Sequence, residues 1–156
     1  MGAFFLDSSA CVKRYVLEAG TEQVRSLFQD EDHDLFLCRL AGPEIVSALT
    51  RRRREKDLDE NAYTIALEAF HRHLQNDLIV IEVTKGVLSL AMDMARRYAI
   101  RGADAVHLAA ACEVRKIREQ LGLSTLVFVC SDETLNRAAQ QEGFELLNPE
   151  GAEPLR

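Results

Sequence analysis

Four acidic residues stand where short apolar runs give way to amphipathic ones: Asp7, Glu44, Asp104 and Asp132. Asp7 directly follows one apolar run, and Asp132 follows another after a single residue. Glu44 and Asp104 fall in the first turns of two predicted helices. If the apolar runs are neighbouring parallel strands, such positions meet at the carboxyl edge of the sheet, where ligands bind. We therefore expect the four carboxylates to share one site.

Carboxylates gathered in one pocket repel one another. A pair separated by ~4–5 Å at an effective dielectric constant near 20 costs roughly 3–4 kcal/mol. Protons or cations must offset this cost. An all-oxygen ligand set suits the hard cations Mg²⁺ and Mn²⁺. One or two such ions bind a phosphodiester, activate water and stabilise a leaving oxygen. The acids thus predict a metal site at Asp7, Glu44, Asp104 and Asp132 with catalytic use in phosphodiester hydrolysis.

Ordinary helix capping is the alternative interpretation of the role of each acid. Asp and Glu in a first turn complement the helix dipole and its free N–H groups. Capping acids usually lie on polar surface, whereas Asp7 and Asp104 are set in largely apolar sequence. Capping alone therefore explains any single acid better than it explains all of them.

The elements that must position these acids follow from periodicity. Predicted strands cover Ala3–Leu6, Asp34–Cys38, Leu78–Val83, Leu126–Cys130 and Phe144–Leu147. Predicted helices cover Ser8–Glu18, Thr21–Gln29, Pro43–Lys56, Glu60–Asn76, Thr84–Tyr98, Ala103–Leu121 and Glu133–Glu142. Strands that alternate with helices pair in parallel through right-handed crossovers. The sequence predicts an α/β fold, a three-layer sandwich with a central, mainly parallel sheet.

Length and composition indicate one globular domain. The chain has 156 residues, of which 47% are hydrophobic. We expect residues 1–149 to form the domain and residues 150–156 to form a flexible tail. No apolar run reaches the ~18 residues of a membrane span, and the N-terminus does not resemble a signal peptide. The four cysteines, Cys11, Cys38, Cys112 and Cys130, lack metal-site spacing and are expected to be buried reduced thiols of a cytoplasmic protein.

The net charge of the chain and its local arginine run support opposite expectations about nucleic-acid binding. The formal net charge is −6, which argues against binding nucleic acid by bulk charge. The run Arg51–Arg54 is a local exception near a predicted helix C-terminus. It is either a solvated helix end, which the dipole favours, or a contact for phosphate or a protein partner. Arg101 could also meet a phosphate.

Two polar residues near the acids have open roles. His107 lies three residues after Asp104 and shares its helix face. It is either a structural histidine or a group that touches substrate or orients a carboxylate. Ser8 either caps the following helix or holds a metal-bound water.

Four segments carry a family resemblance: Phe5–Ala10 (FLDSSA), Gly42–Leu49 (GPEIVSAL), Arg101–Ala111 (RGADAVHLAAA) and Cys130–Ala139 (CSDETLNRAA). In this order and spacing they resemble the successive motifs of PIN domains, and are most similar to those of VapC-type toxins of toxin–antitoxin pairs. The terminal segment Gly143–Pro149 adds to the likeness. The resemblance extends from Ala3 to Pro149, nearly the whole chain.

This resemblance implies a magnesium-dependent endoribonuclease, usually a homodimer, that a cognate antitoxin protein inhibits. Asp7 and Asp104 match the main metal ligands of the family, and Glu44 and Asp132 match its other two acids. Ser131 matches a small hydroxyl position that supports the site. The implied substrate is RNA, and the implied cofactor is Mg²⁺ or Mn²⁺.

Two other functions fit parts of the pattern. Asp7 could be the nucleophile of a phosphotransfer enzyme such as a haloacid-dehalogenase-like phosphatase, but those enzymes need a second Asp where this chain has Ser9. The chain could also be a non-catalytic binding module that keeps the pocket as scaffold. The complete set of acids argues against that reading.

Overall fold

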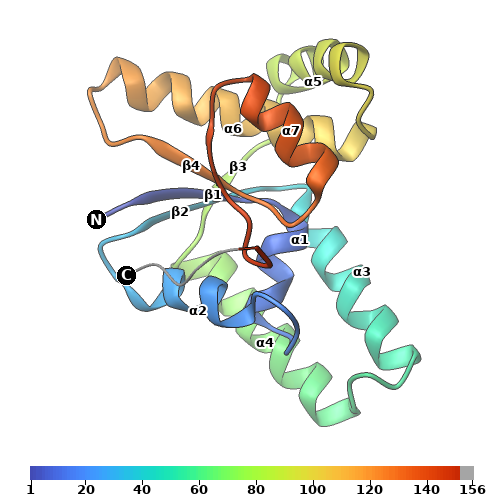
Figure 1. Ribbon diagram of the computed structural model, residues 1–156. Coiled ribbons are helices and arrows are strands. Elements are labelled where there is room, and N and C mark those ends of the chain that lie inside the picture. Colours follow the sequence, from blue (N-terminus) through green and yellow to red (C-terminus); the bar gives the residue numbers. More distant parts are fainter. Residues whose placement is uncertain (152–156) are drawn as a thin grey trace.

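A parallel five-stranded sheet forms the centre of the molecule in the computed structural model, which describes residues 1–151 (Figure 1). Its strands run in the order β3-β2-β1-β4-β5. They are β1 (Ala3–Leu6), β2 (Asp34–Cys38), β3 (Ile79–Ile81), β4 (Leu126–Val129) and β5 (Glu145–Leu147). Every residue of β1 is buried. A strand covered on both faces needs such an unbroken apolar run, so β1 takes the middle position.

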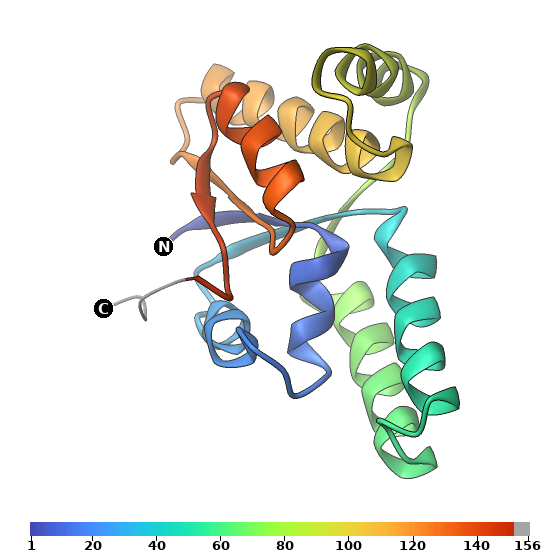
Figure 2. The same ribbon diagram turned by 45° about the vertical axis from the view of Figure 1, so that its right-hand side comes forward.

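Helices cover both faces of the sheet (Figures 1 and 2). One layer contains α1 (Ser8–Cys11), the short 3₁₀ helix η1 (Val12–Arg14), α2 (Thr21–Gln29), α3 (Ala41–Arg54) and α4 (Glu60–Asn76). The other contains α5 (Lys85–Tyr98), α6 (Gly102–Gln120) and α7 (Glu133–Gln141). The predicted three-layer α/β sandwich with a parallel sheet is thus confirmed.

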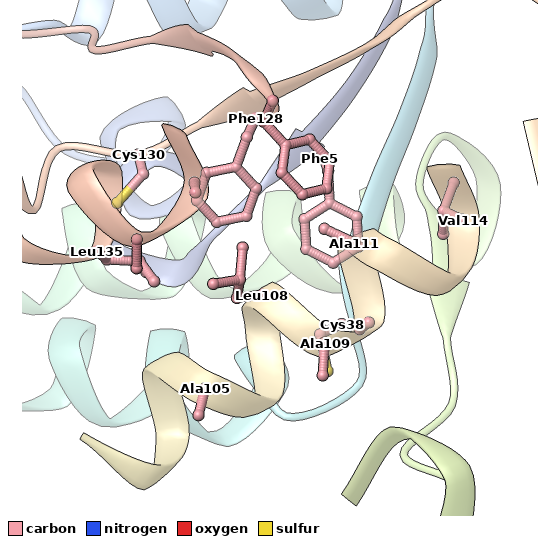
Figure 3. Packing of buried hydrophobic residues seen from close by; sticks show 14 of the residues in the cluster. Phe5, Cys38, Ala105, Leu108, Ala109, Ala111, Val114, Phe128, Cys130 and Leu135 are labelled. Carbon is pink, nitrogen blue, oxygen red and sulfur yellow. The ribbon is translucent and has the colours of Figure 1, made fainter. Parts of the chain in front are cut away.

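Helix α6 packs closely on the sheet through small side chains. Ala109, Ala110 and Ala111 are fully buried in the same cluster as Phe5 and Phe128 of the sheet. Figure 3 shows Ala109 and Ala111 on the helix beside these rings. The two phenylalanine rings stack with their centroids 6.0 Å apart. Alanine lets the helix backbone approach the sheet, which sets the depth at which the first turn of α6 sits.

One predicted helix is wrong. Instead of continuing to Glu18, the helix after β1 ends at Cys11, and η1 adds one tighter turn. The Thr21 hydroxyl donates to the carbonyl of Val16 at 2.8 Å and accepts from the backbone N–H of Glu18 at 2.9 Å. These side-chain bonds offer the backbone an alternative to helical pairing. The other predicted helices and strands form, with ends shifted by at most two residues.

The predicted tail lies mostly outside the described residues, since residues 152–156 are not described. At its start, Glu150 forms an ion pair of 2.7 Å with the buried ammonium of Lys13. Within residues 1–151 all four cysteines are free, and Cys112 is only partly buried. No helix in that span is long and apolar enough to cross a bilayer.

Candidate active site

The four predicted acids line one pocket of about 250 Å³ beyond the carboxyl ends of β1 and β4. Asp7, Glu44, Asp104 and Asp132 each come from the start of a different helix: α1, α3, α6 and α7. Parallel strands place the turns that follow them at the same edge of the sheet, which brings Asp7, Glu44 and Asp132 together. Asp104 joins them because α6, which follows α5 directly, packs on the sheet.

Asp7 is the most deeply placed acid, with only 3% of its surface exposed. Its Oδ1 accepts hydrogen bonds from the backbone N–H of Ala10 at 3.0 Å and from the Ser9 hydroxyl at 2.8 Å. The Cys130 thiol donates to Oδ2 at 3.3 Å. Burial raises the pKa of Asp7, and the hydrogen bonds from Ser9 and Ala10 oppose this only in part. When Asp7 is ionised, its buried negative charge would therefore be stabilised by a bound cation.

Glu44 is held by two donors on one oxygen. Its Oε1 accepts from the Ser8 hydroxyl at 2.7 Å and lies 2.5 Å from His107 Nε2. His107 is 1% exposed, and its Nδ1 has no partner in the described part of the chain. Nε2 is therefore the protonated nitrogen that donates to Glu44. Partial burial raises the pKa of Glu44, but the bonds from His107 and Ser8 outweigh it and the net shift is downward.

Asp104 and Asp132 have different partners. Asp104 pairs with Arg101, the guanidinium Nε lying 2.9 Å from its Oδ2. Asp132 caps α7, where its Oδ1 accepts from the backbone N–H of Leu135 at 2.8 Å. Each of the four acids thus has its own donor from the protein, and none depends on another acid.

Cys130 and Ser131 form a hydrogen-bonded link between Asp7, Ser9 and Asp132. The Cys130 sulfur accepts from the backbone N–H of Asp132 at 3.3 Å while its thiol reaches Asp7. The backbone N–H of Ser131 donates to the Ser9 hydroxyl at 3.1 Å, and its own hydroxyl is buried without a partner in the described chain. From the sequence alone Cys130 is expected to be a buried thiol, and its bonds to Asp7 and Asp132 are not evident. Its position between a strand end and Asp132 is the signal in the sequence that could have indicated them.

Comparison with known proteins identifies the family. No family model matches the chain. Two curated relatives do: Ribonuclease VapC45 and Ribonuclease VapC49, each from a strain of Mycobacterium tuberculosis. Both are 37% identical over 114 residues, which is 73% of this chain and 78% of each relative. The chain belongs to the VapC ribonuclease family.

Solved structures of this PIN-domain family share the fold. Mycobacterium tuberculosis VapC20, a sarcin–ricin loop cleaving toxin, superposes with a TM-score of 0.62 at 17% identity, covering 90% of this chain and 95% of that one. Rickettsia felis VapBC2 bound to promoter DNA gives 0.60 at 12% identity, over 94% and 98% of the two chains. FitAcB from Neisseria gonorrhoeae gives 0.58 at 15% identity, over 96% and 99%.

The pocket of this VapC-family protein fits a hard cation in its donor chemistry but not in the present side-chain positions. Within residues 1–151, no group of three or more His, Cys, Asp or Glu side chains is arranged so that it could hold a metal ion. The carboxylates turn to their protein donors instead. Oxygen donors still dominate the lining, and the deeply buried carboxylate has only neutral donors in hydrogen-bond contact. Direct ligation would need the side chains to rotate toward the pocket centre.

Basic side chains stand at the rim of the same pocket. Arg51, Arg52 and Arg101 line it together with the acids. They give an acidic protein a local positive edge, which a polyanion needs in order to approach carboxylates.

Proposed function

We propose that this protein is the metal-dependent endoribonuclease toxin of a toxin–antitoxin pair, and that it cuts RNA in the acidic pocket. One observation carries the proposal: four carboxylates from four helix starts line a single pocket with an arginine rim. Membership of the VapC ribonuclease family, shared with Ribonuclease VapC45, supports RNA as the substrate.

In this proposal Asp7 and Asp104 hold Mg²⁺ or Mn²⁺, and Glu44 and Asp132 complete the site. Bound there, the cation would lower the pKa of a water and neutralise charge on the phosphodiester. His107 and Ser8 hold Glu44 through Oε1, and Oε2 accepts no hydrogen bond among the described residues. That free oxygen is the one available to orient a water or a ligand. Arg101, which lines the pocket, would draw the phosphate of the cleaved bond toward the acids.

The other two functions have less support. A phosphatase using Asp7 as nucleophile needs a freely presented oxygen and a second acid nearby. Both oxygens of Asp7 accept hydrogen bonds, and Ser9 occupies the position of the second acid. A scaffold without catalysis gains only a helix cap from the buried carboxylate of Asp7, which is costly to ionise.

Partners follow from the same family argument. Two of the structures with this fold are assemblies: VapBC2, and FitAB bound to IR36 DNA. They support an antitoxin protein as the inhibitory partner of this chain, and we propose a homodimer as its own assembly. We also propose that residues 1–149 act as one nuclease domain in the cytoplasm, where the free thiols stay reduced.

Cleavage of a mixed RNA pool tests the proposed function. With Mg²⁺ or Mn²⁺ the protein should release internal fragments, and EDTA should stop the reaction. Asp7→Asn keeps the shape of the side chain but removes its charge, and should abolish cleavage. Asp57→Asn, an exposed acid outside the pocket, is the matched control and should cut normally. Cleavage in EDTA, or equal cutting by Asp7→Asn, contradicts the mechanism. Release of phosphate from small monoesters without RNA cutting indicates the phosphatase instead.

A further inference from the structure

The arginine run at the end of α3 divides into two pairs with different surroundings. Arg52 forms an ion pair with Glu18. Arg53 lies 3.6 Å from Glu60 and stacks over the Tyr63 ring at 4.2 Å. Arg51 and Arg54 are exposed, and neither forms an ion pair within residues 1–151. We call Arg52 and Arg53 the inner pair and Arg51 and Arg54 the outer pair. The inner pair has acidic partners in the fold, and the outer pair has none among the described residues.

The outer pair lies along one face of α3. Pro43, Ser47, Arg51 and Arg54 are spaced by four, four and three residues, which places them on a single stripe. Two hollows of about 440 and 450 Å³ lie along this stripe and share Pro43, Ser47 and Arg51 in their lining. We call this surface the α3 groove.

The α3 groove continues into the acidic pocket. One of its hollows is lined by Glu44 and Arg51, which also line the pocket, while the other ends at Arg54. At 1.5 Å per residue the distance along the helix from Glu44 to Arg54 is about 15 Å. A groove of this length that leads away from the acids can hold more than the bond being cut.

We propose that the α3 groove is a track for the backbone of single-stranded RNA, with Arg51 and Arg54 each contacting a phosphate outside the cleaved bond. This inference rests on the proposed function. A guanidinium is planar and matches a phosphate with two parallel N–H donors. The exposed hydroxyl side chain of Ser47 lies between the acids and the arginines and adds a polar group. In a chain of net charge −6, exposed arginines beside the acids are the features that complement a polyanion.

If Arg51 and Arg54 have a purely structural role, the expected result is different. The C-terminus of a helix favours cations through its dipole, whatever they contact. If that is the whole reason for the outer arginines, replacing them changes melting temperature and leaves RNA binding alone.

Salt-dependent RNA binding tests the track. We would prepare Arg51→Gln, Arg54→Gln and the double variant, with Arg96→Gln on α5 as the matched exposed-arginine control. Binding of a fluorescent mixed-sequence single-stranded RNA is measured by anisotropy in EDTA between about 50 and 200 mM salt. The slope of log affinity against log salt should fall by about 0.7 for each phosphate that the variant no longer binds on a single strand. Affinity should fall about threefold or more for each single variant, while Arg96→Gln is unchanged.

Lysine variants and cleavage kinetics separate the outcomes. Arg51→Lys and Arg54→Lys keep the charge and should retain most of the slope. With Mg²⁺, the glutamine variants should raise KM for long RNA more than they lower kcat, because the arginines would bind phosphate equally before and during reaction. Unchanged slopes in folded variants, or wild-type protein that binds no RNA in EDTA, overturn the track. A reduced slope in a protein that cuts no RNA keeps the track and refutes the nuclease. If the protein cuts RNA but the variants leave the salt slope unchanged, the nuclease is supported and the track is refuted. The groove would then be a site for a protein partner.

Discussion

The acids of the pocket differ in how the protein stabilises their charge. Asp7 is buried and relies on neutral donors, so its pKa is raised. Glu44 is half-buried and bonded to His107, and its pKa is lowered. Two carboxylates in one pocket with pKa values shifted in opposite directions are a common feature of catalytic sites. The contrast follows from which side chains lie against each oxygen.

His107 is expected to act as a positioning residue for Glu44. His107→Ala removes one of the two donors on Oε1, and residues that orient ligands in this way typically change metal affinity or activity by about 10–100-fold. His107→Gln can donate from its amide and should recover much of the activity. The measurement is the Mn²⁺ concentration that gives half-maximal RNA cleavage. His73→Gln, which changes another buried histidine on α4, is the control. An unchanged Mn²⁺ requirement in His107→Ala would show that the histidine is only structural.

Asp7→Asn is expected to stabilise the metal-free protein at neutral pH. The folded-state pKa of Asp7 lies above its unfolded value, so folding favours the protonated acid. That stabilisation is complete below the unfolded pKa and is lost as pH rises through the folded pKa. Each pKa unit is about 1.4 kcal/mol, or about 3–6 °C in melting temperature for a chain of this size. Melting in EDTA should show a gain for Asp7→Asn near pH 7 that shrinks toward pH 4. An equal gain at both pH values would contradict this account.

At the scale of elements, helix starts place the acids and also use two of them as caps. Asp7 caps α1 and Asp132 caps α7 through backbone N–H groups. Glu44 and Asp104 lie in first turns and bond side chains instead. The capping explanation is thus correct for half of the set without opposing a shared pocket. Capping fixes the carboxylate near the strand end, and the sheet brings the caps together.

The close packing of α6 on the sheet predicts sensitivity to added volume. Ala109 is fully buried beside other apolar side chains of the central layer (Figure 3). Ala109→Leu adds three carbon atoms where no space is available, and such overpacking typically costs about 1–3 kcal/mol. Urea unfolding should report this destabilisation. Ala103→Leu, an exposed position in the first turn of α6, is the control and should change stability by less than about 0.5 kcal/mol. Equal stability of Ala109→Leu would show that α6 moves freely on the sheet.

For the whole molecule, charge is distributed so that the acids and the arginine rim share one edge of the sheet. The net charge of −6 does not describe this edge, because Arg51, Arg52 and Arg101 line the pocket beside the acids. A cation that binds the pocket would therefore report on the entire native fold, because only the folded chain brings the acids to one pocket. The expected consequence is stabilisation by metal.

Mg²⁺ or Mn²⁺ should raise the melting temperature of the folded chain. A ligand at 100 times its Kd that binds only the native state adds about 2.7 kcal/mol, which is about 5–10 °C for this size. Asp104→Asn should weaken the response, and Asp57→Asn should not. Relief of like-charge repulsion should also make metal-free Asp104→Asn at least as stable as the wild type. A full metal response in Asp104→Asn would remove that residue from the ligand set.

The order of strands and helices, and the positions of the four acids within it, can be predicted from the amino-acid sequence alone. Ala3–Leu6 is continuously apolar because β1 is buried on both faces, and the helix periods of α4 and α6 are visible over long segments. Alternating elements leave few topologies once crossovers are right-handed, so the parallel sheet and its functional edge could be predicted. The four acids could be predicted as a group because each one follows a strand or opens a helix.

Which side chains meet depends on the folded arrangement of distant segments and could not be predicted from local patterns. The bond from His107 to Glu44 joins residues 63 positions apart, and that from Cys130 to Asp7 joins residues 123 apart. The helix after β1 ends early because Thr21 bonds the backbone beyond it. The four arginines look alike in sequence, yet Glu18 and the Tyr63 ring contact only the inner two. Local patterns determine where the backbone goes, whereas partners far along the chain determine each side chain's charge state and availability.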